Sequence, residues 1–363
     1  MELLNFTKMT AGFTVGLRPD AREVLVVAVK GTFTIPTKGQ ELQLADEQLP
    51  LVDADTFSGE PGFSAPIDEA DYAPFKPRCD VLLRGSAYAP GGRPAQRVPV
   101  ALRVGALAKT FNVVGPRVWT RGMAALTPSE PEFFTVMPIS YDNAFGGIDA
   151  SDPDKPRYFA ANHAGKGFHV HLDLNRVVGQ PLPNTEEIDN PVTNPRASYR
   201  PMAFGPIGRS WDPRPKYAGT YDKDWQENVF PFLPHDFQEE YYQSAPPDQQ
   251  MPCLAGGEQV SLHNLTAEGR VDFMLPRLAL PISVHRRDNA SIDGELLAVN
   301  IDTIRLESDA RRFSLVWRAH CPLKQNLFEI SSVVVGTMPR AMRLAAETGR
   351  TYYRSLGELT AAQ

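Results

Sequence analysis

Hydrophobic and polar residues alternate with a period of two along several stretches of the chain. Residues 23–35 are the clearest example, because apolar side chains fill most of the odd positions from Leu25 to Ile35. The even positions are apolar at first and become polar from Lys30 onward. Successive side chains of a strand point to opposite faces of a sheet. This pattern therefore predicts a strand that runs from the centre of a sheet towards solvent.

The same alternation predicts further strands in both terminal parts of the chain. Turn-forming residues separate these strands, and Asp293-Gly294 is the strongest of these signals because this pair favours a tight hairpin turn. The predicted strands cover residues 98–104, 111–113, 271–275, 295–306 and 313–319.

Helical spacing appears near the C-terminus, at residues 338–348. Thr337 can cap the start of this helix and Gly349 can end it. Apolar side chains recur three or four positions apart within it, from Met338 to Ala345. We expect this apolar stripe to dock on the body of the protein.

Residues 127–251 follow neither period and hold about half of the 33 prolines, a residue that interrupts helices and strands. Aromatic residues fill about a quarter of positions 199–242, whereas disordered linkers are poor in aromatic residues. We therefore expect ordered loops that bury their rings against a β scaffold. Long loops of this kind commonly carry function.

These patterns predict a mainly β fold with antiparallel, sandwich-type halves that pack together and with one short C-terminal helix. Long loops rich in proline, glycine and aromatic residues cover one side of it. The predicted segments, which together form one continuous module, are an N-terminal β half (1–126), a loop-rich region (127–260), a C-terminal β half (261–336) and a helical tail (337–363).

Charge and composition exclude some classes of protein. The chain has 43 acidic and 37 basic residues, a net charge of −6, whereas a dedicated nucleic-acid binder carries a basic excess. It lacks an apolar run of 18 residues and a signal-peptide pattern at its start. These features predict a cytoplasmic protein that neither binds nucleic acid nor inserts into membranes.

Two groups of residues are candidates for chemistry. His163, His169 and His171 could contribute to a metal site, but their spacing matches no standard zinc motif. We therefore interpret them as structural or surface histidines and predict neither a metal nor a cofactor. Six carboxylates, from Asp222 to Glu240, lie among the aromatic residues of the stretch from Trp211 to Tyr242. They allow an alternative function, a carbohydrate-active hydrolase or sugar-binding β-sandwich, because glycosidases pair two carboxylates beside an aromatic platform.

A series of motifs is more specific than either group. Residues 76–92 read KPRCDVLLRGSAYAPGG. Further motifs follow in order along the chain: MPISY at 137–141, AFGG at 144–147, FGPI at 204–207, GTYD at 219–222, LPHDF at 233–237 and APPDQ at 245–249. The order of so many motifs resembles that of a bacterial family whose genes lie beside those of type VI secretion effectors. Residues 162–168 and 183–187 depart locally from the family pattern.

Members of that family serve as effector chaperones or adaptors. The resemblance implies a non-enzymatic, cytosolic protein that binds a toxin, often one with a PAAR-type domain. It further implies that the protein helps to load this toxin on the VgrG spike. No catalytic residue carries over from the family.

Rigid loops and aromatic side chains suit this role, because they lose little entropy on binding and supply large contact areas. We predict partner contacts at Trp211, Tyr217, Tyr221 and Trp225. A scaffold role, in which motif residues hold the loops together, is predicted for Phe145, Gly146, Gly147, Phe204, Gly205, Pro206, Asp236 and Phe237.

Overall fold

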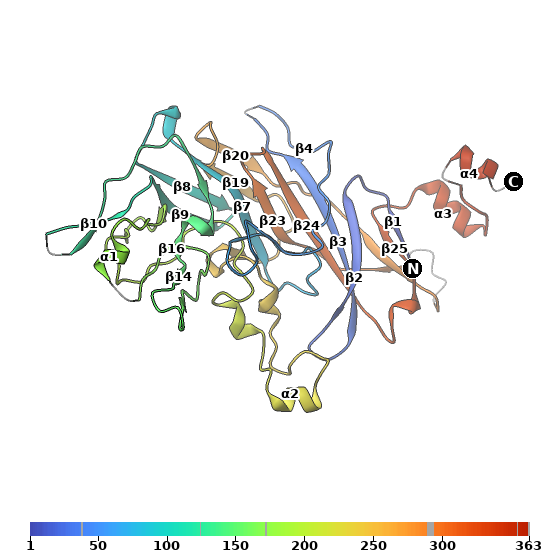
Figure 1. Cartoon of the computed structure of the whole chain (residues 1–363). Helices are drawn as coiled ribbons and strands as arrows, with labels where there is room; N and C mark the ends of the chain where they lie inside the picture. The colour runs from blue at the N-terminus through green and yellow to red at the C-terminus, as the bar shows by residue number, and fades with distance from the viewer. Residues whose placement is uncertain (38, 124, 171–172, 289–293, 354, 362–363) are drawn as a thin grey trace.

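The computed structural model describes residues 1–37, 39–123, 125–170, 173–288, 294–353 and 355–361 (Figure 1). Strands dominate it, most of their pairings are antiparallel, and the helices are short. This confirms the predicted mainly β fold. Asp293 of the predicted turn lies outside the described residues, and so does His171.

The largest sheet has strands from both terminal parts of the chain. Its order is β12-β7-β23-β24-β3-β2, and β23 and β7 are parallel neighbours. Two short strands join it, β4 beside β3 and β18 beside β7. The strands are β2 (Thr10–Leu17), β3 (Glu23–Thr34), β4 (Gln43–Leu44), β7 (Cys79–Tyr88), β12 (Val136–Ile139), β18 (Gln250–Met251), β23 (Val299–Glu307) and β24 (Arg312–Pro322).

N-terminal and C-terminal strands interleave in this sheet. β3 pairs with β24 along its length, and β7 pairs with β23. The two predicted β halves therefore share one sheet. The apolar start of β3 explains its inner place, because a strand that is apolar on both faces is buried on both faces.

A five-stranded sheet packs against the large one. Its order is β17-β9-β8-β19-β20. The rings of Phe273 on β20 and Phe313 on β24 lie 5.1 Å apart between the two sheets, and both belong to the same hydrophobic core. The strands are β8 (Arg97–Val104), β9 (Leu107–Val114), β17 (Thr185–Glu186), β19 (Gln259–His263) and β20 (Arg270–Met274).

A third sheet extends this core with the order β1-β25-β21-β22, in which β1 and β25 are parallel. Ile282 and Val333 of this sheet belong to the hydrophobic core. Its strands are β1 (Glu2–Asn5), β21 (Ile282–Arg286), β22 (Glu295–Leu296) and β25 (Ile330–Val335). Two-stranded pairs complete the β structure: β5 (Thr56–Phe57) with β6 (Pro66–Asp68), β10 (Trp119–Arg121) with β11 (Leu126–Pro128), β13 (Phe145–Gly146) with β16 (Lys166–Gly167), and β14 (Ile148–Asp149) with β15 (Arg157–Tyr158).

The polar face of β3 reaches solvent only at its end, where Thr34 is exposed, and the prediction fails for the two polar positions before it. Lys30 is 2% exposed and Thr32 is fully buried. Residues 45–52 and Asp71 cover this face: Lys30 pairs with Asp71, and the Thr32 hydroxyl accepts a hydrogen bond from Leu49 N. Polar positions on a strand can thus be buried where a loop supplies partners for them.

The loop-rich region is ordered by its aromatic rings, as expected. Phe145 packs edge-on against Tyr199, and Phe204 packs against Phe111 of β9. All four rings are buried. Short helices lie between the loops: α1 (Leu174–Val177) and α2 (Lys223–Asn228).

The C-terminal tail forms two helices, α3 (Arg340–Glu347) and α4 (Leu356–Ala361). Only α3 was predicted. Figure 1 shows both helices beyond the edge of the sheets, so the apolar stripe of α3 does not dock on the β body as expected. Leu344 and Ala345 instead line a space shared with Tyr352 and Leu359 of the tail. Within the described part of the chain, each helix is too short or too polar to cross a membrane.

Candidate partner-binding surface

The four aromatic residues predicted to contact a partner occupy different environments. Trp211 is 2% exposed, whereas Tyr221 is 54% exposed. Tyr217 and Trp225 are half-buried. The structure thus divides the predicted set into one core residue and a group around Tyr221.

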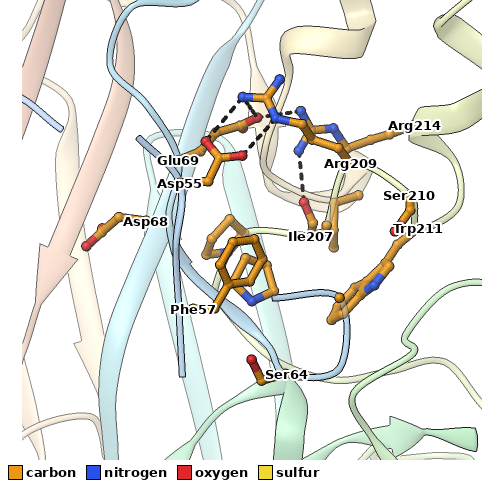
Figure 2. A pocket seen from close by; sticks show the side chains of 14 residues that line it. Asp55, Phe57, Ser64, Asp68, Glu69, Ile207, Arg209, Ser210, Trp211 and Arg214 are labelled. Atoms are coloured by element: carbon orange, nitrogen blue, oxygen red, sulfur yellow. Dashed lines mark hydrogen bonds and ion pairs between the residues drawn. The ribbon is translucent and has the colours of Figure 1, made fainter. Parts of the chain in front are cut away.

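Trp211 belongs to the interior of the loop-rich region. Its ring meets Tyr141 edge-on at 5.6 Å and lies 6.0 Å from the ring of His163. It also lines a cavity of about 180 Å³ together with Phe57 and Ile207 (Figure 2). Trp211 therefore holds loops together and presents no free surface to a partner.

Tyr221 and Trp225 belong to a projecting segment, residues 219–240, which we call the aromatic lobe, whereas Tyr217 lies just before it. α2 forms its tip and stands away from the sheets at the bottom of Figure 1. Phe230 is 66% exposed and Phe232 is 43% exposed. Together with Tyr221 they place three aromatic side chains in solvent within one short segment. Apolar side chains that are exposed together can mark an interaction site, whereas single exposed ones are ordinary.

Hydrogen bonds and ring contacts fix these side chains. Asp222 Oδ1 accepts a hydrogen bond from Trp225 N at 2.9 Å and so caps the start of α2. Trp225 Nε1 donates to the carbonyl oxygen of Phe232 at 3.0 Å. The Tyr221 and Phe230 rings both stand edge-on to Trp225, at 4.8 and 5.6 Å. The exposed rings of Tyr221 and Phe230 are therefore preorganised, which lowers the entropy that binding costs.

Asp236 and Thr220 join the two ends of the lobe, and we call this part of the lobe, around Gly219–Thr220 and Asp236–Phe237, the neck. The two carboxylate oxygens of Asp236 accept hydrogen bonds from Thr220, from the backbone N at 2.9 Å and from Oγ1 at 2.7 Å. These hydrogen bonds lower the pKa of Asp236. Gly219 has a φ of +81°, and a Cβ there would lie 2.9 Å from Asp236 Oδ1. The neck therefore needs a glycine beside the aspartate.

Phe237 continues the neck into the protein. It is buried, and its ring packs against Tyr241 at 5.8 Å and Tyr242 at 5.4 Å. The backbone N of Gln238 donates to Tyr217 O at 3.0 Å. This hydrogen bond thus joins the two chain segments of the neck where they enter the body of the protein.

An ion network in which Arg214 and Glu69 are buried anchors the neck of the lobe (Figure 2). Arg214 donates to Glu69 at 2.6 Å and to the Tyr241 carbonyl oxygen at 2.8 Å. Arg209 pairs with the same glutamate and with Asp55. Burial alone would raise the pKa of Asp55, but hydrogen bonds from Arg209 and the Ala70 backbone lower it overall. Charged hydrogen bonds of this kind fix loops firmly.

Sequence reasoning did not find this anchor. The partners of Arg209 and Arg214 lie about 150 positions away in the sequence, in the loops around β5 and β6. A pairing over that separation leaves no signal in a single sequence.

The lobe is strongly acidic. Within residues 219–240 six carboxylates face a single lysine, whereas the whole chain has a net charge of −6. Among the described residues, one ion pair involves these carboxylates, Lys223 with Glu227 at 3.4 Å on the exposed side of α2. The six are Asp222, Asp224, Glu227, Asp236, Glu239 and Glu240.

Several of these carboxylates have structural tasks. Asp222 caps α2, Asp224 accepts a hydrogen bond from Asn228 at 2.7 Å, and Asp236 closes the neck. The aromatic rings pack edge-on against each other. A glycosidase needs two carboxylates beside an aromatic platform, and the carbohydrate alternative stays a prediction.

The residues predicted to act as loop scaffold lie inside the protein. Phe204 O accepts hydrogen bonds from Leu83 N of β7 and from Gln249, which joins the FGPI loop to the large sheet. Gly205 and Pro206 follow in the same loop and line a cavity beside β7. Phe145 is buried as well.

Gly146 and Gly147 have positive φ angles and pass close to another loop. A Cβ on Gly146 would lie 2.3 Å from the Asn162 carbonyl oxygen, and one on Gly147 would lie 2.3 Å from that of Gly165. Asn162 is fully buried and donates to the carbonyl oxygens of Tyr141 and Phe145. This asparagine was not singled out from the sequence, although it completes the scaffold.

The histidines form no metal site in the part of the chain that the structure describes. There, no three His, Cys, Asp or Glu side chains are grouped to hold an ion. His163 contacts the rings of Tyr158 and Trp211, and burial lowers the pKa of His169. His171 lies outside the described residues.

Comparison with known proteins gives one match. The model of a bacterial family described as "Uncharacterized protein conserved in bacteria (DUF2169)" matches residues 20–318. No curated protein and no solved structure matches the chain. The matched residues include the aromatic lobe and exclude α3 and α4.

Proposed function

Because the chain belongs to this bacterial family of uncharacterized conserved proteins, we propose its function from its motifs and from the surface that it presents. The protein is a cytoplasmic adaptor that binds a type VI secretion effector, one with a PAAR-type domain. It stabilises this effector and helps to load it on the VgrG spike. The motif series supports the secretion-system context, and the aromatic lobe supports protein binding.

The observation that carries the proposal is the exposure of Tyr221, Phe230 and Phe232 on a preorganised, projecting segment. Tyr and Trp side chains are enriched among the residues that dominate binding energy at protein interfaces. Rings that already hold their positions bind with a small entropic cost. The lobe is therefore the surface that we assign to the effector.

Co-expression with the toxin encoded beside its gene tests this proposal. The wild-type protein is expected to raise the amount of soluble toxin and to elute with it from a sizing column. The triple variant Tyr221→Ala/Phe230→Ala/Phe232→Ala is expected to lose the complex, because truncation of interface anchors commonly costs about 2 kcal/mol each or more.

A matched control removes three exposed phenylalanines elsewhere, Phe63→Ala/Phe133→Ala/Phe328→Ala. These side chains are 57%, 67% and 81% exposed, so their removal leaves the core intact. The control variant is expected to keep the complex. A wild-type protein that neither solubilises the toxin nor elutes with it would refute the adaptor role, and a control that loses binding while the lobe variant keeps it would refute the lobe as the contact surface.

A further inference from the structure

We infer that the aromatic lobe receives a basic segment of its protein partner, one that presents Arg or Lys side chains among apolar ones. This inference rests on the proposed adaptor function and specifies the chemistry of the partner. It begins from the three exposed rings of the lobe, because an apolar surface alone does not say what covers it.

Charge supplies the second step. Six carboxylates and one lysine give residues 219–240 nearly all of the net negative charge of the chain. Asp222, Asp224 and Glu227 lie on or beside α2, next to the exposed rings. These carboxylates would repel an acidic partner, whereas a basic partner is steered to the lobe and oriented on it.

The geometry of the carboxylates supplies the third step. Glu240 is exposed and forms no ion pair with the described residues. Asp222 uses Oδ1 for the helix cap, and no hydrogen bond within the described chain uses its Oδ2. The lobe therefore offers carboxylate oxygens that its own cations do not neutralise, and guanidinium groups bind such oxygens strongly.

The exposed rings favour the same partner. An Arg or Lys side chain can lie over the face of Tyr221, Phe230 or Phe232, an attraction that adds about 0.5–1 kcal/mol at exposed sites. Trp225 already contacts two of these rings edge-on, which leaves their remaining faces to the partner. A basic segment with apolar neighbours thus satisfies both parts of the surface.

Binding assays with the toxin encoded beside the gene test this inference. The first probe is a set of synthetic peptides that tile the toxin sequence. We expect the bound peptides to carry a net positive charge, and their affinity to fall at least about tenfold between about 0.05 M and about 0.5 M NaCl. Bound peptides that are neutral or acidic would overturn the inference.

Charge variants of the full-length protein provide the second probe. Asp224→Asn/Glu227→Gln/Glu240→Gln neutralises three lobe carboxylates and is expected to weaken toxin binding at least about tenfold. The control Glu41→Gln/Asp46→Asn/Glu130→Gln neutralises three exposed carboxylates elsewhere and is expected to bind like wild type. Melting temperatures of both variants show whether they fold.

The outcomes separate the two proposals. If wild type and both charge variants bind the toxin equally, the adaptor function stands and the basic-segment inference fails. If only the lobe charge variant binds the toxin more weakly, the adaptor function and the basic-segment inference both stand. If wild type does not bind the toxin at all, the adaptor function fails and the inference fails with it.

Discussion

Lys30 on β3 and Asp71 in the covering loop form an ion pair that water does not reach, since each side chain is 2% exposed. Asp71 also accepts a hydrogen bond from Val52 N at 2.8 Å, and Arg305 lies 3.5 Å from its other oxygen. The pair thus joins the large sheet to the loop that covers its polar face. Loss of one partner would leave the other charge buried.

Lys30→Met is therefore expected to lower the free energy of unfolding by about 3–5 kcal/mol, because a buried charge without its partner is costly. The double variant Lys30→Met/Asp71→Leu is expected to lose less than the sum of the two single variants. Urea unfolding of the four proteins measures this. Equal losses for the double variant and the sum would contradict the coupling, and Lys223→Met on the exposed surface of α2 serves as a control without measurable effect.

Acid is expected to weaken the same contact. Burial alone would raise the pKa of Asp71, but the charges of Arg305 and Lys30 lower it below the ordinary value of 3.8. A carboxyl with a lowered pKa stabilises the fold above its unfolded pKa, and this stabilisation is lost as the pH falls further. Asp71→Asn should therefore show a smaller loss of stability between pH 5 and pH 3 than wild type; parallel curves would contradict this.

His320 gives a second pH dependence. It lies on β24 against Phe75, and burial, assisted by the positive charge of Arg318, lowers its pKa from 6.5 to about 4. Arg18 acts in the same direction and Asp302 opposes it. The unfolded state binds the proton more readily between these values, so stability is full above pH 6.5 and falls as the pH approaches 4.

His320→Gln is expected to flatten this part of the stability curve. The wild-type protein should lose about 1–3 kcal/mol of unfolding free energy between pH 6.5 and pH 4 through this group, given about 1.4 kcal/mol for each pH unit. Chemical unfolding at a series of pH values measures the slope. Identical slopes for variant and wild type in this window would show that His320 does not cause this pH dependence of stability.

The fold was predictable where a residue acts through its local neighbours. The strand that contains Leu25 and the one that contains Phe313 were both visible as alternating patterns, and the aromatic residues of the loop-rich region were expected to be buried. The pairing of β3 with β24 was not predictable, because it joins residues almost 300 positions apart. The burial of Lys30 was not predictable for the same reason, since its partner belongs to a distant loop.

The site was predictable in part. Tyr221 and Trp225 were selected because of their residue type, and they do form a projecting surface. Trp211 was selected by the same reasoning and is buried, because residue type does not indicate which side of a loop faces the core. Phe230 and Phe232, which are exposed, were not selected as partner contacts. The acidic charge of the lobe was legible in the sequence, but its position beside exposed rings required the structure.

Gly146 provides a test of the scaffold. Its φ is +145°, and a Cβ there would lie 2.3 Å from a backbone oxygen, so Gly146→Ala is expected to destabilise the protein by at least about 2–3 kcal/mol. Gly179 has a φ of +85° with open space around it. Gly179→Ala should therefore lose only about 1 kcal/mol. Thermal unfolding compares the two, and equal losses would contradict the close approach at Gly146.

Substitutions of Trp211 and Phe230 distinguish a residue of the core from a residue of the lobe. Trp211→Ala removes a buried ring and is expected to lower the unfolding free energy by about 3–5 kcal/mol. Phe230→Ala removes a ring that is 66% exposed, so stability should change by less than about 1 kcal/mol. Urea unfolding distinguishes these outcomes. A large loss for Phe230→Ala would show that the lobe supports the fold.

The central claim is that the aromatic lobe is the surface that contacts the effector. A photo-crosslinking amino acid placed at Phe230 tests it most directly, with the same residue at exposed Phe133 as the control. Irradiation of cells that also express the proposed type VI effector is expected to join this effector to the protein through position 230 and not through position 133. A crosslink at position 133 without one at position 230 would contradict the claim.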